Sequence, residues 1–293
     1  MSIHQSVMLK EMLEFLAPKP GQNFVDCTFG GGGYAKEILK RIGPSGKLLA
    51  LDLSPEAVKV AREIKDKNFI FINDNFLYLS AIIRQYFPYP LHGFVFDLGL
   101  SSDELEMSGR GFSFQKNEPL DMRFDPKTEL TAADILNHGS LAELNNIFKN
   151  YGECQFARRL AEEILINRKH SKFNTTTDLV AVVNKIHPRR YFERLHPATK
   201  VFQALRIAVN HELENFSEAL KQTENILAPG GRVVTVCFHA LEDRIAKNYF
   251  RSGSRGADKK WLLLTKKPLT PELSEVALNP RSRSAKLRAV EKI

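Results

Sequence analysis

The residues best suited to chemistry in this sequence are two acids on either side of a glycine run. Asp26 follows an apolar segment and precedes four consecutive glycines at 30–33, and Asp52 follows the next apolar run. Glycines tolerate positive φ angles and let ligand atoms approach the backbone, and the first amide groups of a following helix attract a negative group. An acid after the second strand suits the hydroxyls of a ribose. This order predicts a binding site for an adenosine-containing cofactor.

Two cofactors fit this pattern. Gly30, Gly32 and Ala35 match the dinucleotide spacing G-x-G-x-x-A, so a nicotinamide-dependent oxidoreductase is an open alternative. Asp26 argues against it, because a carboxylate beside the turn would repel a pyrophosphate. S-adenosylmethionine carries an ammonium, a sulfonium and a carboxylate but no phosphate. Asp26 can serve the cations while the amides of the turn serve the carboxylate, so the residues favour S-adenosylmethionine.

The elements that must position these residues alternate between strands and helices. Short apolar segments typical of parallel strands occur at 23–26, 47–53, 69–73, 93–98 and 232–238, with weaker candidates at 261–265 and 286–291. Helical patterns occupy 34–41 and 55–64, and Ser54 with Pro55 is typical of a helix start. The order predicts an α/β domain with a Rossmann-like parallel sheet.

About a hundred residues separate the fourth strand from the fifth, which is too many for an ordinary crossover. Amphipathic patterns predict helices at 141–151, 155–168 and 179–186, and one long helix at 201–227 that ends before Ala228-Pro229-Gly230-Gly231. We therefore predict a sheet domain formed by residues 1–104 and 201–293. It is interrupted by an all-helical substrate-recognition insertion at 105–200.

Composition sets the outer bounds. A chain of 293 residues with 43% hydrophobic content can bury a full core, and no apolar run approaches the roughly 20 residues of a membrane span. The N-terminus shows no secretory signal pattern. Three scattered cysteines give neither a disulfide framework nor a zinc pattern. These features predict a cytoplasmic protein with no metal and no membrane partner, and the net charge of +8 indicates a polyanionic partner.

Basic residues gather in three tracts that suit a nucleic acid. The first holds Arg158, Arg159, Arg168, Lys169 and Lys172; the second holds Lys185, Arg189, Arg190 and Arg194 among aromatic residues; the third runs over 279–288. Positive charge follows phosphates and aromatic rings stack on bases. A solvated helix face is the open alternative for each tract, and three tracts together favour contact with RNA.

Three dense segments at 96–102, 110–123 and 238–244 are the candidates for the reaction itself. Asp97, Ser101 and Ser102 follow the fourth strand, and His239 and Asp243 follow the fifth, where open α/β sheets bind their ligands. Each segment has a structural alternative. Asp97 could cap a helix, the acid and the arginine at 121 and 123 could form an ion pair, and the histidine could be a buried core residue.

The chain resembles the bacterial and organellar ribosomal small-subunit RNA (cytosine-N4)-methyltransferase family, originally named MraW. The resemblance runs from His4 to Ile293, and the matching segments are 4–11, 26–33, 97–102, 110–114, 120–123, 196–199, 202–206, 238–244 and 279–288. It implies a class I S-adenosylmethionine-dependent methyltransferase fold with an inserted helical domain. It also implies the reaction, N4-methylation of a cytidine near the P site in the decoding centre of 16S rRNA in the small ribosomal subunit.

The motifs and the resemblance together predict the residues of the site. We predict cofactor contacts by Asp26, Gly30, Gly32, Gly33, Tyr34, Asp52, Phe76, Asp97 and Glu104, and catalytic roles for Asp97, Ser101, Ser102, His239 and Asp243. Asp97 with Ser101 and Ser102 would accept the N–H of the cytosine amine, localising its lone pair.

The chain departs from the family pattern at a few of these places. Tyr34 stands where the family has histidine, Ser54 where it has a second acid, and Ala240 where it has serine, while Ser6 and Asp103-Glu104 replace prolines and a glutamine. These departures leave a non-catalytic ribosome-assembly factor as an alternative. The sequence also leaves the oligomeric state open, with a homodimer as one alternative.

Overall fold

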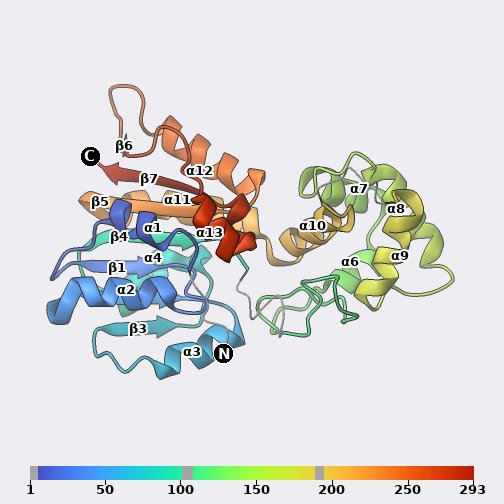
Figure 1. The fold of residues 1–293 in the computed structure, drawn as a ribbon, viewed down its shortest axis with the longest axis horizontal. Coiled ribbons are helices and arrows are strands. Elements are labelled where there is room, and N and C mark those ends of the chain that lie inside the picture. The colour runs from blue at the N-terminus through green and yellow to red at the C-terminus, as the bar shows by residue number, and fades with distance from the viewer. Residues whose placement is uncertain (1–5, 101–107, 189–194) are drawn as a thin grey trace. The chain divides into compact units, whose positions relative to one another are not determined.

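The computed structural model describes residues 6–100, 108–188 and 195–293. The chain forms two compact units, one of Met1–Gly99 with Leu213–Ile293 and one of Leu100–Glu212 (Figure 1). The second unit therefore extends beyond the expected insertion at 105–200. The reason is helix α10 (Ala198–Asn210), which packs on α6, α7 and α9 and contributes Val201 and Leu205 to the core of that unit.

The first unit is built on a seven-stranded sheet with the order β3-β2-β1-β4-β5-β7-β6. Its strands are β1 (Asn23–Asp26), β2 (Lys47–Leu51), β3 (Phe69–Ile72), β4 (Leu91–Asp97), β5 (Leu227–Cys237), β6 (Trp261–Leu263) and β7 (Lys286–Lys292). Strands β1 to β5 pair in parallel, whereas β7 runs antiparallel to β5 and to β6. All seven expected strands are present. Most differ by one or two residues at their ends, but β5 begins five residues before the expected start and includes the segment 228–231 that was expected to precede it.

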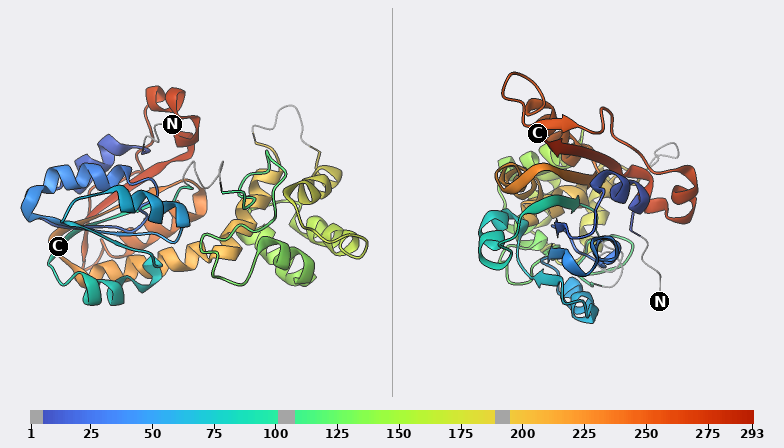
Figure 2. Two further views of the ribbon diagram at one scale, coloured as in Figure 1. Left: turned by 90° about the horizontal axis from the view of Figure 1, so that it is seen from below. Right: turned by 90° about the vertical axis from the view of Figure 1, so that its left-hand side faces the viewer.

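Successive residues of the central strands face opposite layers. Phe24 packs with one apolar cluster and Val25 with the other, and Phe94 and Val95 divide in the same way. One layer holds α1 (Leu9–Leu16), α2 (Gly33–Ile42) and α3 (Pro55–Glu63); the other holds α4 (Leu79–Tyr86), α11 (Glu212–Ile226) and α12 (Ala240–Ser252). Helices thus cover both faces of the sheet (Figure 2), and the predicted α/β class is confirmed.

The second unit is helical. It contains α6 (Ala132–His138), α7 (Leu141–Asn150), α8 (Ala157–Asn167), α9 (Thr176–Ile186) and α10 around one apolar core. Thr131, Ser140 and Thr175 form capping boxes at the starts of α6, α7 and α9, which satisfies the first amide groups of each helix.

The single helix expected at 201–227 is wrong. The chain turns at His211, which has a φ of 51°, so that α10 ends and α11 begins. Nε and Nη2 of Arg206 donate to the two carboxylate oxygens of Glu212 across this turn, each at 2.8 Å. The Asn210 amide donates to the carbonyl of Met122 at 2.7 Å. That last contact joins residues 88 positions apart, so helix periodicity could not reveal it.

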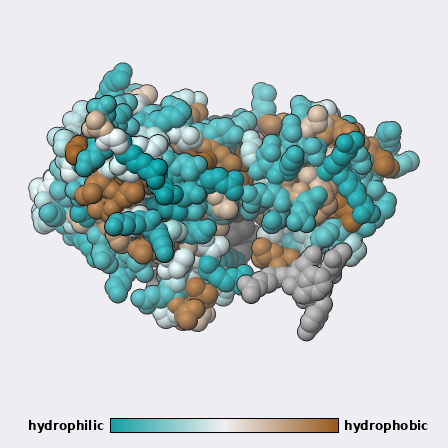
Figure 3. Space-filling view, turned by 90° about the horizontal axis from the view of Figure 1, so that it is seen from above, coloured by the Kyte–Doolittle hydropathy of each residue, from teal (hydrophilic) through white to brown (hydrophobic). Residues whose placement is uncertain are grey.

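The surface is mainly polar. The face in Figure 3 is largely hydrophilic, and its apolar side chains form small separate patches. None of the helices in the described part of the chain combines the length and apolarity needed to cross a membrane.

Candidate active site

The candidate site lies where the strand order of the sheet reverses, between β1 and β4. Asp26 ends β1 and Asp97 ends β4, and these neighbouring strands run in parallel. Open α/β sheets bind ligands at the carboxyl ends of their strands at such a reversal. The fold therefore brings together two acids that are 71 positions apart in the sequence.

The glycine turn after β1 needs its glycines for space and for backbone conformation. Gly32 has a φ of 72°, and a Cβ there would lie 2.8 Å from the ring of Phe29. A Cβ on Gly33 would lie 1.9 Å from Oγ of Ser6. Gly30 also has a positive φ, 50°. The turn can therefore keep this backbone and pack against Phe29 and Ser6 only with glycine at positions 32 and 33.

Asp52 joins this turn to the end of β2. Its Oδ2 accepts a hydrogen bond from the amide of Gly30 at 2.8 Å, and its Oδ1 accepts from the amide of Ser54 at 2.8 Å. Ser54 also caps α3 by accepting from Ala57, as predicted. Burial raises the pKa of Asp52. The contact with a ribose hydroxyl that is expected of this residue stays a prediction.

Thr28 links the two acids of the site, and it was not among the predicted site residues. Its amide donates to Oδ1 of Asp26 at 3.1 Å, and its Oγ1 accepts from the amide of Asp97 at 2.6 Å. The spacing Asp-x-Thr is typical of an Asx turn, which was the available signal. The second link spans 69 positions and needs the paired strands.

Buried polar atoms without a hydrogen-bond partner concentrate at this edge of the sheet. Within the described residues there are four: Oδ2 of Asp26, Oδ1 of Asp97, Nε2 of His239 and Nε1 of Trp261. The first three belong to predicted site residues that end or follow β1, β4 and β5. Such atoms are uncommon in folded proteins and point to a ligand that completes them.

Burial and mutual repulsion favour the neutral form of the two acids. Burial raises the pKa of Asp26 to about 7, with repulsion from Asp52 adding to it. Burial and then repulsion from Asp26 raise the pKa of Asp97 to about 8. A cation beside these carboxyls would favour their charged form and lower both pKa values. The site is therefore built to receive positive charge.

His239 begins α12 directly after β5. Its Nδ1 accepts from the amide of Glu242 at 3.4 Å, and Glu242 in turn accepts from the amides of Phe238 and His239. This capping box places the ring proton on Nε2. Nε2 lies 2.9 Å from Oε1 of Glu242 but outside hydrogen-bond geometry, so it is available as a donor.

Asp243 is occupied by a buried ion pair. Nε and Nη2 of Arg288 donate to its two carboxylate oxygens at 2.7 and 3.2 Å, and Nζ of Lys286 lies 3.7 Å away. Asp243 and Arg288 are both buried. A direct catalytic role for Asp243 stays a prediction; the observed contacts join α12 to β7.

Five predicted site residues remain: Tyr34, Phe76, Ser101, Ser102 and Glu104. Phe76 is half-buried in the short 3-10 helix Phe76–Tyr78 after β3, with its ring edge-on to Phe96 at 5.9 Å. Tyr34 is buried in the first turn of α2. Ser101, Ser102 and Glu104 lie outside the described residues.

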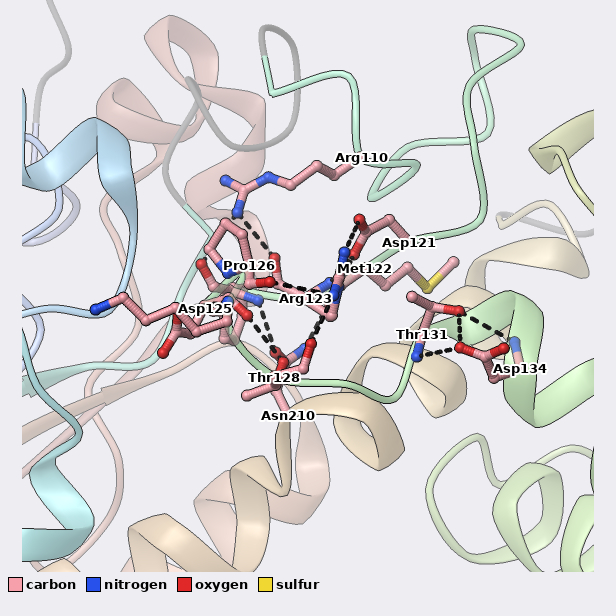
Figure 4. Close-up of polar contacts among 12 residues, drawn as sticks. Arg110, Asp121, Met122, Arg123, Asp125, Pro126, Thr128, Thr131, Asp134 and Asn210 are labelled. Atoms are coloured by element: carbon pink, nitrogen blue, oxygen red, sulfur yellow. Dashed lines mark hydrogen bonds and ion pairs between the residues drawn. The ribbon is translucent and has the colours of Figure 1, made fainter.

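The segment before α6 is held by polar contacts, all within the second unit. Arg123 binds both carboxylate oxygens of Asp121 at 2.7 and 2.8 Å, and its Nη1 donates to the carbonyls of Pro126 and Thr128 (Figure 4). Nη1 of Arg110 donates to the carbonyls of Arg123 and Phe124 at 2.8 and 3.0 Å. The ion pair considered as the structural alternative for 121 and 123 is confirmed.

The basic tracts divide into structural and exposed side chains. Arg168 bonds the carbonyls of Leu136 and Gly139, and Arg288 is buried, so both serve the fold. The exposed members in the described part of the chain are Arg158, Arg159, Lys169, Lys172, Lys185, Arg281 and Arg283. Residues 189–194 of the second tract lie outside that part.

A fourth basic feature was not expected. A hollow of about 960 Å³ beside α2 is lined by Lys36, Lys40, Lys65 and Lys67, together with two acids, Glu37 and Asp66. The four lysines come from α2 and from the connection between α3 and β3, which are separated in sequence. This hollow offers the first unit a net positive surface.

The residues present fit S-adenosylmethionine. The unpaired oxygens of Asp26 and Asp97 suit its cationic groups, Asp52 suits a ribose, and the glycine turn leaves room for close approach. A doubly wound sheet with these residues at its strand ends defines an S-adenosylmethionine-dependent methyltransferase, and the nicotinamide alternative is set aside.

Comparison with known proteins identifies the group within this class. The model of the MraW methylase family matches residues 1–293, so the chain belongs to that family. Proteins named ribosomal RNA small subunit methyltransferase H are similar to it. One from Dictyoglomus thermophilum is 46% identical, covering 99% of this chain and 97% of its own length, and one from Dehalococcoides mccartyi is 44% identical, covering 99% and 86%. A solved rRNA methylase from Streptococcus thermophilus is 11% identical over 97% of this chain and 93% of its own, with a TM-score of 0.44.

Proposed function

We propose that this methyltransferase transfers a methyl group to N4 of a cytidine in the decoding centre of 16S rRNA in the small ribosomal subunit. Its relatives carry the name of a small-subunit rRNA methyltransferase, which supports the class of substrate. The observation that carries the reaction is Oδ1 of the half-buried Asp97, a buried oxygen that has no partner and lies at the strand reversal.

The chemistry needs an acceptor for one proton. The exocyclic amine of cytosine is a weak nucleophile because its lone pair is delocalised into the ring. S-adenosylmethionine would supply the electrophilic methyl group on a positively charged sulfur, and the methyl–sulfur bond would break to leave a neutral thioether. Asp97 accepts the N–H of the amine, which localises the lone pair on nitrogen, and takes the proton released when the new C–N bond forms. The protein otherwise aligns the reacting atoms.

Asp97 must be ionised for this role. Its pKa of about 8 keeps it largely protonated at neutral pH before the ligands bind. Positive charge beside Asp97 favours its carboxylate form, so Asp97 becomes a proton acceptor when a cationic ligand binds next to it. His239, with Nε2 as a donor, can orient the cytidine by bonding one of its acceptor atoms.

RNA reaches such a site by unstacking the target base. The exposed basic residues on both units, including those of the lysine-lined hollow, offer contacts to phosphates. Such contacts would bind the flanking RNA without reading its sequence.

Nucleoside mass analysis of small-subunit rRNA from cells with and without the gene tests this proposal. We expect N4-methylcytidine to disappear on deletion and to return with the wild-type gene. The variant Asp97→Asn should not restore it, whereas Asp258→Asn, a change at an exposed position between α12 and β6, should. An unchanged nucleoside profile on deletion would reject the proposal.

A further inference from the structure

The residues just before α1 lie against the glycine turn of the site. A Cβ on Gly33, the first residue of α2, would lie 1.9 Å from Oγ of Ser6, so these two residues are in contact. The carbonyl of Val7 accepts a hydrogen bond from the hydroxyl of Tyr34, the second residue of α2. The segment 6–8 therefore contacts the first turn of α2, which follows directly from the glycine turn.

The last residue of this segment is held by a distant part of the chain. The amide of Met8 donates to Oε1 of Glu275 at 2.8 Å, across 267 positions. Met8 is the N-cap of α1, with a φ of 52°, and its side chain makes no capping hydrogen bond. The first amides of a helix have no acceptor within the helix, and a carboxylate is favourable beside them. Glu275 therefore provides the cap that the side chain of Met8 cannot provide.

Glu275 belongs to a surface segment that is tied to the sheet before it reaches α13 (Leu273–Leu278). Leu269 and Leu287 of β7 exchange two backbone hydrogen bonds, at 2.9 and 3.0 Å. The helix α13 itself buries none of its residues, and Leu273 is 88% exposed, whereas Glu275 is half-buried. Because α13 buries so little apolar surface, we expect its hydrogen bond to Met8 to be the main link between α13 and the start of α1.

We propose that Glu275 is a positioning residue for cofactor binding, which acts through the segment 6–8 on the glycine turn. Its carboxylate holds that segment, and the segment contacts the first two residues of α2. A ligand that meets a turn already in place does not have to order it, so the ligand binds more tightly. The role depends on S-adenosylmethionine as the cofactor and not on the proposed RNA target.

The state of the turn can be followed at one amide. The amide of Lys36 donates to the carbonyl of Gly32 at 3.0 Å, and this bond ties the first turn of α2 to the glycine turn. Its hydrogen exchange in the ligand-free protein, measured by NMR, therefore reports how firmly the turn is held. The reference is the amide of Leu48 at the start of β2, which donates to the carbonyl of Asn68 at 2.9 Å.

Three variants isolate the hydrogen bond between Glu275 and Met8. Glu275→Ala removes the acceptor, whereas Glu275→Gln keeps a side-chain oxygen that can accept from Met8. The matched control is Glu272→Ala, which removes an exposed carboxylate at the N-cap of α13 that makes no capping hydrogen bond. Calorimetry without RNA measures the affinity of each variant for S-adenosylmethionine.

We expect Glu275→Ala to raise the dissociation constant of S-adenosylmethionine about fivefold or more, the usual size of coupling between linked sites. Exchange at Lys36 should become about tenfold faster through the loss of one hydrogen bond, while exchange at Leu48 stays within about twofold. Glu275→Gln and Glu272→Ala should match wild type within about twofold in both measurements.

The inference requires both effects in Glu275→Ala, so an unchanged affinity or an unchanged exchange at Lys36 would overturn it. Equal acceleration at Lys36 and Leu48 would also overturn it, because that result indicates a general loss of stability. A loss in Glu275→Gln as large as in Glu275→Ala would show that the hydrogen bond is not the cause.

These readouts separate the inference from the proposed reaction, because neither of them uses RNA. If deletion leaves the nucleoside profile unchanged but Glu275→Ala weakens cofactor binding as expected, the positioning role stands and the proposed target falls. If the target is confirmed and cofactor binding is insensitive to position 275, the positioning role falls alone.

Discussion

Cofactor binding should depend on pH through Asp26, and the change Asp26→Asn should remove the share of that dependence that comes from this carboxyl, leaving the share of Asp97. Asp26 is fully buried and one of its oxygens has no partner, so its pKa is about 7 in the ligand-free protein. A cationic ligand beside it requires the charged carboxylate and lowers its pKa. Binding therefore releases a proton at pH values below about 7.

The size of the effect follows from this pKa. The fraction of Asp26 that is already ionised falls from about 0.9 at pH 8 to about 0.1 at pH 6. Through this group, the dissociation constant of the cofactor should thus be about tenfold higher at pH 6 than at pH 8, which corresponds to about 1.4 kcal/mol of binding free energy. About 0.9 proton should be released on binding at pH 6 and about 0.1 at pH 8 from this group.

Calorimetry with S-adenosylmethionine in two buffers of different ionisation enthalpy measures both quantities. Protons that the ligand itself gains or loses affect every variant equally, so the comparison is between wild type and Asp26→Asn. Asp258→Asn, at an exposed position between α12 and β6, is the matched control and should behave as wild type. If wild type and Asp26→Asn show the same pH dependence and proton release, Asp26 does not serve the cations and the reasoning fails.

Three further changes test the construction of the site. The folded pKa of Asp26 lies above its unfolded value, so between about pH 4 and pH 7 the folded state binds more protons and its stability falls as pH rises. Asp26→Asn should therefore stabilise the ligand-free protein by up to about 4 kcal/mol at pH 8 and by less at pH 5. Urea unfolding at the two pH values measures this difference. Gly32→Ala should cost about 2 kcal/mol or more through its positive φ and a ring contact at 2.8 Å, whereas Gly230→Ala, with a positive φ and open space, should cost about 1 kcal/mol; equal losses would contradict the packing argument. Asp243→Ala should lower stability by about 3–5 kcal/mol because Arg288 is left buried without its partner, and a stable variant with selective loss of kcat would instead favour a catalytic role.

Much of the fold could be predicted because it depends on local pattern. Continuous apolar runs give the strands, since strands buried on both faces need apolar residues at every position. The Ser54 cap and the glycine turn are also local, because they depend on hydroxyl capping and on missing Cβ atoms. The break at His211 was missed, because histidine in a left-handed conformation is set there by contacts with distant residues.

The sequence by itself determined which residue types are available to the site: acids after strands, glycines at the turn, and a histidine at a helix start. Only the tertiary structure decided what those residues meet. Parallel pairing of β1 and β4 places Asp26 and Asp97 together, and the desolvation and repulsion there raise their pKa values. Contact between α12 and β7 commits Asp243 to Arg288. Burial and mutual repulsion depend on distances between segments far apart in the chain, so no local pattern contains them.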